Sequence, residues 1–179
     1  DTIGNLFSAN KISEYLKSQR VDMLPKTILE YLTYLNSAYF VRRIRPMDIQ
    51  GKKQFQIGEK YYFEDLGIRN AIRPFRATDI GQVLENVVCH HLLVCGYALY
   101  IGRDGDKEVD FVAERNGEKL YVQVAYSVID PKTHEREFGN LLAIQDNYPK
   151  IVVTMDEVEG VSYQGIEQVP VRKFLLRWK

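Results

Sequence analysis

The sequence of 179 residues is poor in cysteine and has no long apolar run. Its two cysteines, Cys89 and Cys95, fall six residues apart in one expected helix, so their side chains face different directions and no disulfide is expected. The absence of a Cys-x-x-Cys pair excludes a zinc ribbon. The absence of about 20 consecutive apolar residues excludes a membrane span, and the first residues lack the regions of a signal peptide. We therefore expect a cytoplasmic protein with reduced thiols and no membrane partner.

The chain also has no excess of charge and no phosphate-binding loop. Its 24 Lys and Arg balance 24 Asp and Glu, which excludes a strongly basic nucleic-acid binder by global charge but leaves local basic patches open. No Gly-x-x-x-x-Gly-Lys-Ser/Thr occurs, so no ATP site of the P-loop type is expected in these residues. The sequence does not begin with Met, which fits a fragment of a longer polypeptide.

The first 70 residues have the element order of a winged helix. Residues 8–18 predict a helix capped by Ser8 or Asn10, and a second helix opens near Pro25 after a short turn. An extended stretch from Tyr39, a turn over residues 50–53 and further strand-like residues up to Phe63 follow. Two helices and then a β-ribbon predict a small winged-helix-like domain over residues 1–70.

The expected wing is rich in cationic side chains, and Lys60 is one of them. A basic ribbon beside two helices can bind DNA phosphates. The alternative is a solvated wing that packs on another domain, and the second helix offers few polar side chains for reading bases. The residues predicted to contact DNA are Arg42, Arg43, Arg45, Lys52 and Lys53.

The second half alternates helices and strands. Residues 69–76 are expected to form a linker, and a helix is expected over residues 79–94, with Asp79 and Gln82 as its capping box. A strand, a hairpin, a helix, two short strands and a terminal helix follow. This order predicts an α/β domain over residues 71–179, with a mixed sheet flanked by helices.

The dipeptide Asn116-Gly117 predicts a tight hairpin and fixes its register. One face then carries apolar pairs and is expected to be the core face. The other carries Asp110 opposite Gln123 and is expected to point out of the core. The predicted core pairs are Ala113 with Leu120, Phe111 with Val122, and Val109 with Val124, and the predicted outer pairs also include Val112 with Tyr121 and Glu108 with Ala125.

Two interpretations of Asp110 are open. One is a solvated hairpin face. The other adds Glu85 from the preceding helix and Gln123 from the partner strand, as in the catalytic site of a divalent-metal nuclease. Carboxylate oxygens suit Mg²⁺, which polarises a phosphate and lowers the pKa of water. In the second interpretation Glu85 and Asp110 would bind the metal.

Several segments carry a resemblance to a known family. The run Gly105-Asp106-Lys107-Glu108-Val109-Asp110-Phe111-Val112, followed by Leu120-Tyr121-Val122-Gln123-Val124-Ala125-Tyr126, resembles the PD-(D/E)xK nuclease superfamily. With the runs at residues 135–139 and 146–150, the chain is more closely similar to a domain of unknown function at the C-terminus of many prokaryotic AAA+ ATPases. The resemblance covers nearly the whole chain. It implies a restriction-endonuclease-like fold after a winged helix, and an upstream ATPase module of the same polypeptide as partner.

The sequence departs from the nuclease motif at one important position. Ala125 stands where the motif has its lysine, and alanine cannot stabilise charge on a phosphate or activate water. Gln123 also stands where an acid is common. We therefore expect a degenerate site and an accessory region that binds DNA or serves as a docking module. An active Mg²⁺-dependent nuclease and a module that contacts only protein are the alternatives.

Overall fold

The computed structural model describes residues 7–51 and 58–177, and the side chains up to residue 176. The elements, in chain order, are α1 (Ala9–Ser18), α2 (Pro25–Ser37), β1 (Val41–Asp48), β2 (Lys60–Phe63), α3 (Leu66–Ile72), the 3-10 turn η1 (Ala77–Asp79), α4 (Ile80–Val94), β3 (Ala98–Asp104), β4 (Lys107–Arg115), β5 (Glu118–Ala125), α5 (Pro131–Leu142), β6 (Lys150–Thr154), β7 (Ser162–Tyr163), β8 (Ile166–Pro170) and α6 (Val171–Arg177).

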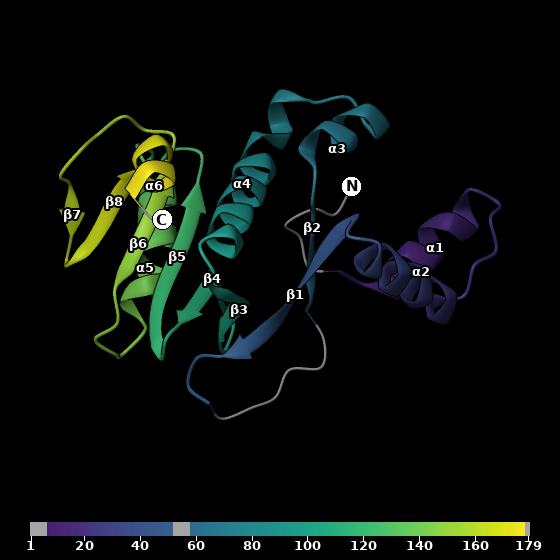
Figure 1. Ribbon diagram of the computed structural model, residues 1–179, viewed down its shortest axis with the longest axis horizontal. Coiled ribbons are helices and arrows are strands. Elements are labelled where there is room, and N and C mark those ends of the chain that lie inside the picture. Colours follow the sequence, from purple (N-terminus) through teal and green to yellow (C-terminus); the bar gives the residue numbers. More distant parts are fainter. Residues whose placement is uncertain (1–6, 52–57, 178–179) are drawn as a thin grey trace.

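The strands form one mixed sheet in the order β2-β1-β3-β4-β5-β6-β8-β7 (Figure 1). Helices α4 and α6 pack on one face and α5 packs on the other. Phe111 and Val122 lie in the apolar cluster under α4, and Val112 and Tyr121 lie in the cluster under α5. The predicted mixed sheet flanked by helices is therefore present.

Strand β1 connects the N-terminal helices to this sheet. Its first half pairs antiparallel with β2, where Val41 faces Phe63, and its second half pairs parallel with β3, where Arg45 faces Tyr100. One sheet therefore contains strands from both sides of residue 70 in the sequence. The winged-helix identity of the first part and the domain division at residue 70 stay predictions.

The hairpin β4–β5 follows the predicted register near its turn. Asn116 and Gly117 both have positive φ, 55° and 81°, as the tight turn requires. Phe111 pairs with Val122 and Val112 with Tyr121, as expected. The expected outer face was wrong, because Val112 and Tyr121 are fully buried under α5.

A β-bulge explains why the predicted pairing ends at Phe111. Between the pairs Tyr100–Val112 and Gly102–Val109, β4 carries one residue more than β3. The extra residue reverses which face of the sheet the side chains before the bulge reach, so Val109 joins the α5 cluster instead of the α4 cluster. Gly102 stands opposite the bulge, where an added Cβ would lie 2.9 Å from side-chain carbons of Ile49 and Val112.

Two local expectations before α4 were also wrong. Residues 69–76 are not a linker throughout, because α3 covers residues 66–72 and Asp65 caps it by accepting from the amides of Gly67 and Ile68. Asp79 does not cap α4 with its side chain. Its carboxylate instead accepts from the buried guanidinium of Arg69 at 2.7 Å.

Candidate functional site

The candidate site lies between β2, the N-terminal half of α4 and the bulge of β4. The ammonium of Lys60 lies 3.0 Å from Glu85 Oε1, 2.7 Å from Glu108 Oε1 and 3.4 Å from Asp110 Oδ1. The Lys60 side chain is only 3% exposed. Glu85 and Asp110, which the sequence places 25 residues apart, therefore converge as predicted, but they converge on a lysine.

The carboxylates determine the charge of this lysine. Burial alone would lower the pKa of Lys60, but Asp110, Glu85 and Glu108 more than reverse that effect and raise the pKa above its usual range. Lys60 is therefore a permanent cation at neutral pH. It supplies one positive charge at the point where a bound metal ion would supply two.

Further groups hold two of the acids in place. The hydroxyl of Tyr62 donates to Glu85 Oε1 at 2.6 Å, and burial together with Glu85 raises the pKa of that hydroxyl well above its usual range. Arg103 on β3 lies 2.9 Å from the second oxygen of Glu108. Each of these carboxylates is thus shared between Lys60 and another donor.

Asp110 sits at the bulge and has both oxygens engaged. Oδ1 faces Lys60, and Oδ2 accepts from the amide of Val124 at 2.9 Å. Burial and the neighbouring Glu85 raise the pKa of Asp110 to about 7, against the opposing effects of Lys60 and the Val124 amide. The side chain therefore titrates near neutral pH.

Gln123 lies next to Asp110, and both ends of its carboxamide are hydrogen-bonded. Its Oε1 accepts from the backbone amide of Asp110 at 3.3 Å, and its Nε2 donates to Glu137 Oε2 on α5 at 2.7 Å. Glu137 is buried and also receives the guanidinium of Arg136. Gln123 thus links the β4 bulge to α5 and has its oxygen occupied.

This arrangement leaves little room for a metal. Among the residues that the structure describes, no group of three or more His, Cys, Asp or Glu side chains is placed to hold a metal ion. Ala125, at the position of the motif lysine, is 7% exposed and packs in the apolar cluster under α5. The Lys60 ammonium can neutralise the buried acids around it and so hold β2, β4 and α4 together.

Sequence reasoning missed the lysine and two of the acids. Lys60 was assigned to the basic wing, although its position in the strand after the wing could have suggested that its side chain is covered. Glu137 falls within a run that resembles the nuclease family, and Glu108 lies two residues before Asp110. Neither the spacing nor the hairpin register predicted that these two would join the site.

The predicted DNA-contacting residues are placed differently from one another. Arg42 lies 2.8 Å from Glu64, Arg43 lies 3.8 Å from Glu59, and Arg45 is exposed. Lys52 and Lys53 fall outside the described residues. The charge of the two paired arginines is therefore partly neutralised by the glutamates on either side of β2.

Both cysteines are free of disulfides, as expected. Cys89 is fully buried in the α4 cluster, whereas Cys95 is partly exposed at the end of α4. Across residues 7–51 and 58–177, none of the helices combines the length and the apolar character needed to cross a membrane.

The fold and the site define a mixed α/β protein with a buried cluster of acids around one lysine. The chain belongs to the family described as Domain of unknown function (DUF4143), which matches residues 80–174. An uncharacterized protein of Haemophilus influenzae is 37% identical over 177 residues, a match that covers 99% of this chain and 44% of that protein. The chain therefore spans less than half the length of this relative. No solved structure gives a significant match.

Proposed function

We propose that the chain is a non-catalytic accessory region of a longer prokaryotic ATPase of the AAA+ type. In this proposal its nuclease-like part has lost cutting activity and serves for binding or docking, and its winged-helix-like part contacts DNA. The single observation that carries the loss of activity is the Lys60 ammonium among Glu85, Glu108 and Asp110. Phosphodiester cleavage by this class needs a metal-bound water and free coordination positions.

The burial of the site supports the same proposal. Asp110 and Gln123 are 8% and 6% exposed, so a phosphate could not reach them without displacing the side chains that cover them. Both oxygens of Asp110 and the oxygen of Gln123 already have donors. A hard cation would have to replace these donors and expel a buried ammonium.

An active nuclease is the second candidate, and one observation favours it. Lys60 brings a positive charge beside Asp110, which is the role that Ala125 cannot fill. A lysine contributed by a different strand could stabilise charge on a phosphate. The two candidates make opposite predictions for cleavage.

We expect the purified chain to leave supercoiled plasmid intact with Mg²⁺ or Mn²⁺. Loss of one electrostatic contact in a catalytic site commonly costs about 10²–10³ in rate, and here the acids are occupied as well. Gel electrophoresis of the plasmid over several hours measures the result. Nicking that disappears in both Asp110→Ala and Lys60→Met variants would show an active site and overturn the proposal. Nicking that persists in both variants would come from a contaminant.

We expect weak, salt-sensitive and sequence-tolerant DNA binding by the basic ribbon. Replacing Arg42, Arg43, Arg45, Lys52 and Lys53 with Ala should weaken binding and reduce the slope of log K against log salt by about 0.9 for each lost phosphate contact. Fluorescence anisotropy with a labelled duplex at several salt concentrations measures both effects. A matched control replaces three exposed basic residues elsewhere, Lys107, Lys132 and Arg172. Equal loss in the control, or no binding by the parent at low salt, would remove the ribbon from the proposal.

A further inference from the structure

Helix α3 turns a charged side chain inward and its apolar side chains outward. Arg69 is the one residue of this helix that is buried, and its guanidinium contacts the buried carboxylate of Asp79. Ile68 and Ile72, which lie one turn apart, are 44% and 65% exposed, and Phe75 just beyond the helix is 49% exposed. A helix that packs on its own core normally does the reverse. The exposed side of α3 therefore has the composition of a contact surface.

The same segment is rich in positive charge. Residues 66–78 contain three arginines and no acidic residue. The charge of Arg69 is balanced by Asp79, whereas Arg73 is partly exposed and Arg76 is exposed. Arginine and aromatic side chains are among the types enriched where proteins meet. The residues defined here as the basic patch are Ile68, Ile72, Arg73, Phe75 and Arg76.

The loop between β6 and β7 has the opposite charge and also exposes apolar side chains. Residues 151–171 contain four acidic residues and no Lys or Arg. Met155 and Val158 are 42% and 46% exposed, and Glu157 and Glu159 are exposed next to them in the chain. The residues defined here as the acidic patch are Met155, Glu157, Val158 and Glu159.

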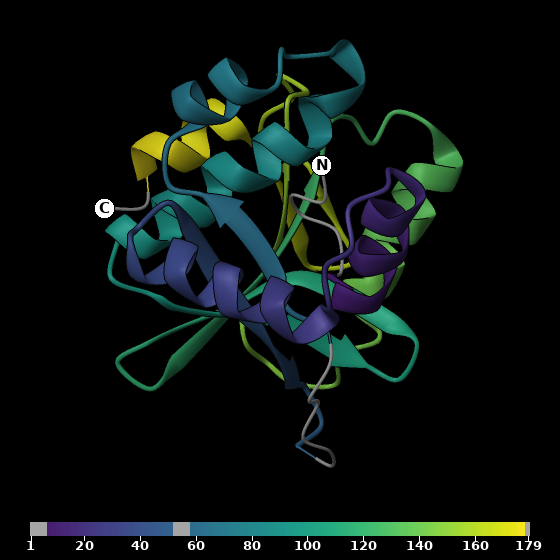
Figure 2. The ribbon, with the colours of Figure 1, turned by 90° about the vertical axis from the view of Figure 1, so that its right-hand side faces the viewer.

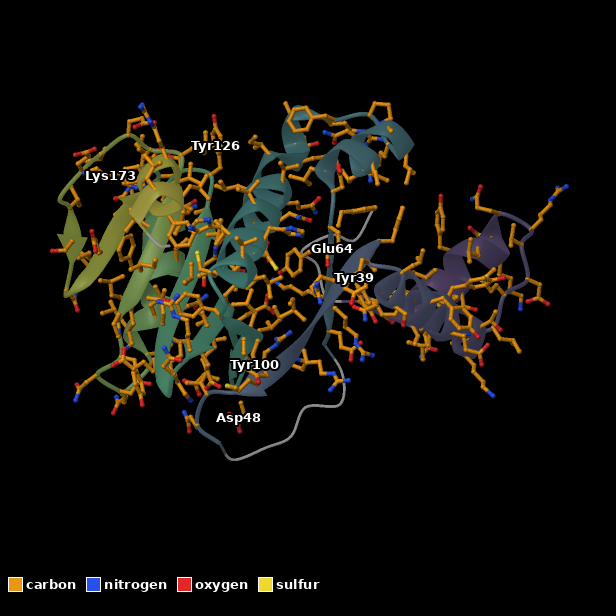
Figure 3. All side chains as sticks on the ribbon, viewed as in Figure 1. Tyr39, Asp48, Glu64, Tyr100, Tyr126 and Lys173 are labelled. Atoms are coloured by element: carbon orange, nitrogen blue, oxygen red, sulfur yellow. The ribbon has the colours of Figure 1, made fainter. Side chains whose placement is uncertain are left out.

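Both patches lie at the same edge of the molecule. The amide of Met155 donates to the carbonyl of Tyr126 at 3.0 Å, so the acidic patch begins beyond the carboxyl ends of β5 and β6. Tyr126 and Lys173, which contacts Glu159 and balances one of the acids, mark this edge in Figure 3. Helix α3 lies at the same upper edge in Figures 1 and 2, and Figure 1 shows α4 between it and the acidic patch. The two patches of one chain therefore do not meet each other.

We propose that the two patches form the interface of a symmetric dimer, in which the basic patch of each chain packs on the acidic patch of a second copy. A two-fold axis joins both pairs at once, because each chain carries one patch of either charge at the same edge. A second copy is the occupant that the structure favours, since the chain itself supplies the complementary charge together with apolar side chains. Arg76 and Glu157 carry the charge recognition, and the proposal depends neither on nuclease inactivity nor on DNA binding.

Charge reversal in each patch, followed by mixing of the variants, tests the proposal. Sedimentation velocity of the purified chain at low salt should show dimers in a concentration-dependent equilibrium with monomers, and added salt should weaken them. Arg76→Glu and, separately, Glu157→Arg should each raise the dissociation constant about ten-fold or more, because like charges then meet twice in the symmetric interface. An equimolar mixture of the two variants should form dimers again, since both contacts then join opposite charges. The matched control is Lys11→Glu, an exposed residue of α1 away from both patches, which should leave self-association unchanged (Figure 1).

Three results would overturn the proposal. A chain that stays monomeric at low salt has no such interface, and if Arg76→Glu then weakens binding to duplex DNA, the basic patch belongs to nucleic acid instead. Dimers that persist in both single variants place the interface elsewhere. Two monomeric variants that do not associate on mixing show that the patches do not face one another. The plasmid assay is unaffected in each case, so failure here can be told apart from failure of the proposed function.

Discussion

Replacing Lys60 with methionine is expected to lower the free energy of unfolding by about 3–5 kcal/mol at pH 8, which is the usual cost of removing one partner of a buried ion pair. Methionine retains most of the volume but leaves Glu85, Glu108 and Asp110 without their shared cation. Arg103 would still partly neutralise the charge of the Glu108 carboxylate. Urea unfolding followed by circular dichroism measures the change.

The control is a lysine whose ion pair is on the surface. Lys119 lies 3.3 Å from Glu114, and both side chains are about 30% exposed. Lys119→Met should cost no more than about 1 kcal/mol, because exposed pairs contribute little. Adding Asp110→Asn to the Lys60→Met variant should recover part of the loss, because one uncompensated charge is removed. A Lys60→Met variant as stable as the parent would contradict the assigned role of the ammonium.

The same variant also tests the metal interpretation. If Mn²⁺ raises the midpoint of unfolding of Lys60→Met but not that of the parent, the acids can take a divalent cation once the lysine is gone, since a ligand that binds only the native state stabilises it. The parent should show no such shift. A shift in the parent would mean that the ion displaces Lys60.

Local patterns predicted the elements well because local chemistry determines them. Ser8 caps α1, Pro25 begins α2 and Asp130 caps α5, as side chains with these preferences should. Asn116-Gly117 fixed the register of the five hairpin pairs from Phe111–Val122 to Arg115–Glu118. In each case the signal and its consequence lie within a few residues of one another.

The contents of the site could not be predicted in the same way. Lys60 reaches Asp110 across 50 residues, and only the parallel pairing of β1 with β3 brings β2 to the base of α4. No turn residue or proline in the sequence marks the bulge at Asp110. The bulge changes the face of the sheet that nearby side chains reach, which strict alternation along the strand does not predict. Glu137 joins the site because α5 covers a face that was expected to meet solvent.

Stability is expected to fall as the pH rises from about 5 to 8. Asp110 has a pKa of about 7 in the folded chain, above the value near 4 of an unfolded aspartate. The native state therefore binds more protons than the unfolded state between these values, and its advantage is complete below pH 4 and lost as the pH passes 7. One pKa unit corresponds to about 1.4 kcal/mol, so the loss between pH 5 and 8 should be about 2–3 kcal/mol.

The charged groups that face Asp110 also affect the pH range in which stability changes. Glu85 raises its pKa, Lys60 and the Val124 amide lower it, and Glu137 raises it from the α5 side. Because these groups interact, the observed midpoint belongs to the cluster. Asp79 titrates in a separate window, since its hydrogen bond from Arg69 holds its pKa low and its contribution is lost only in more acidic solution.

Asp110→Asn should therefore flatten the profile between pH 5 and 8, because the asparagine side chain does not ionise. Urea unfolding at half-unit intervals of pH measures the slope for parent and variant. Asp106→Asn is the matched control, since Asp106 is exposed in the turn between β3 and β4 and its loss should leave the slope unchanged. A parent whose stability rises from pH 5 to 8 would mean that Asp110 is ionised throughout this range. Lys60 would then outweigh burial and Glu85 in setting its charge.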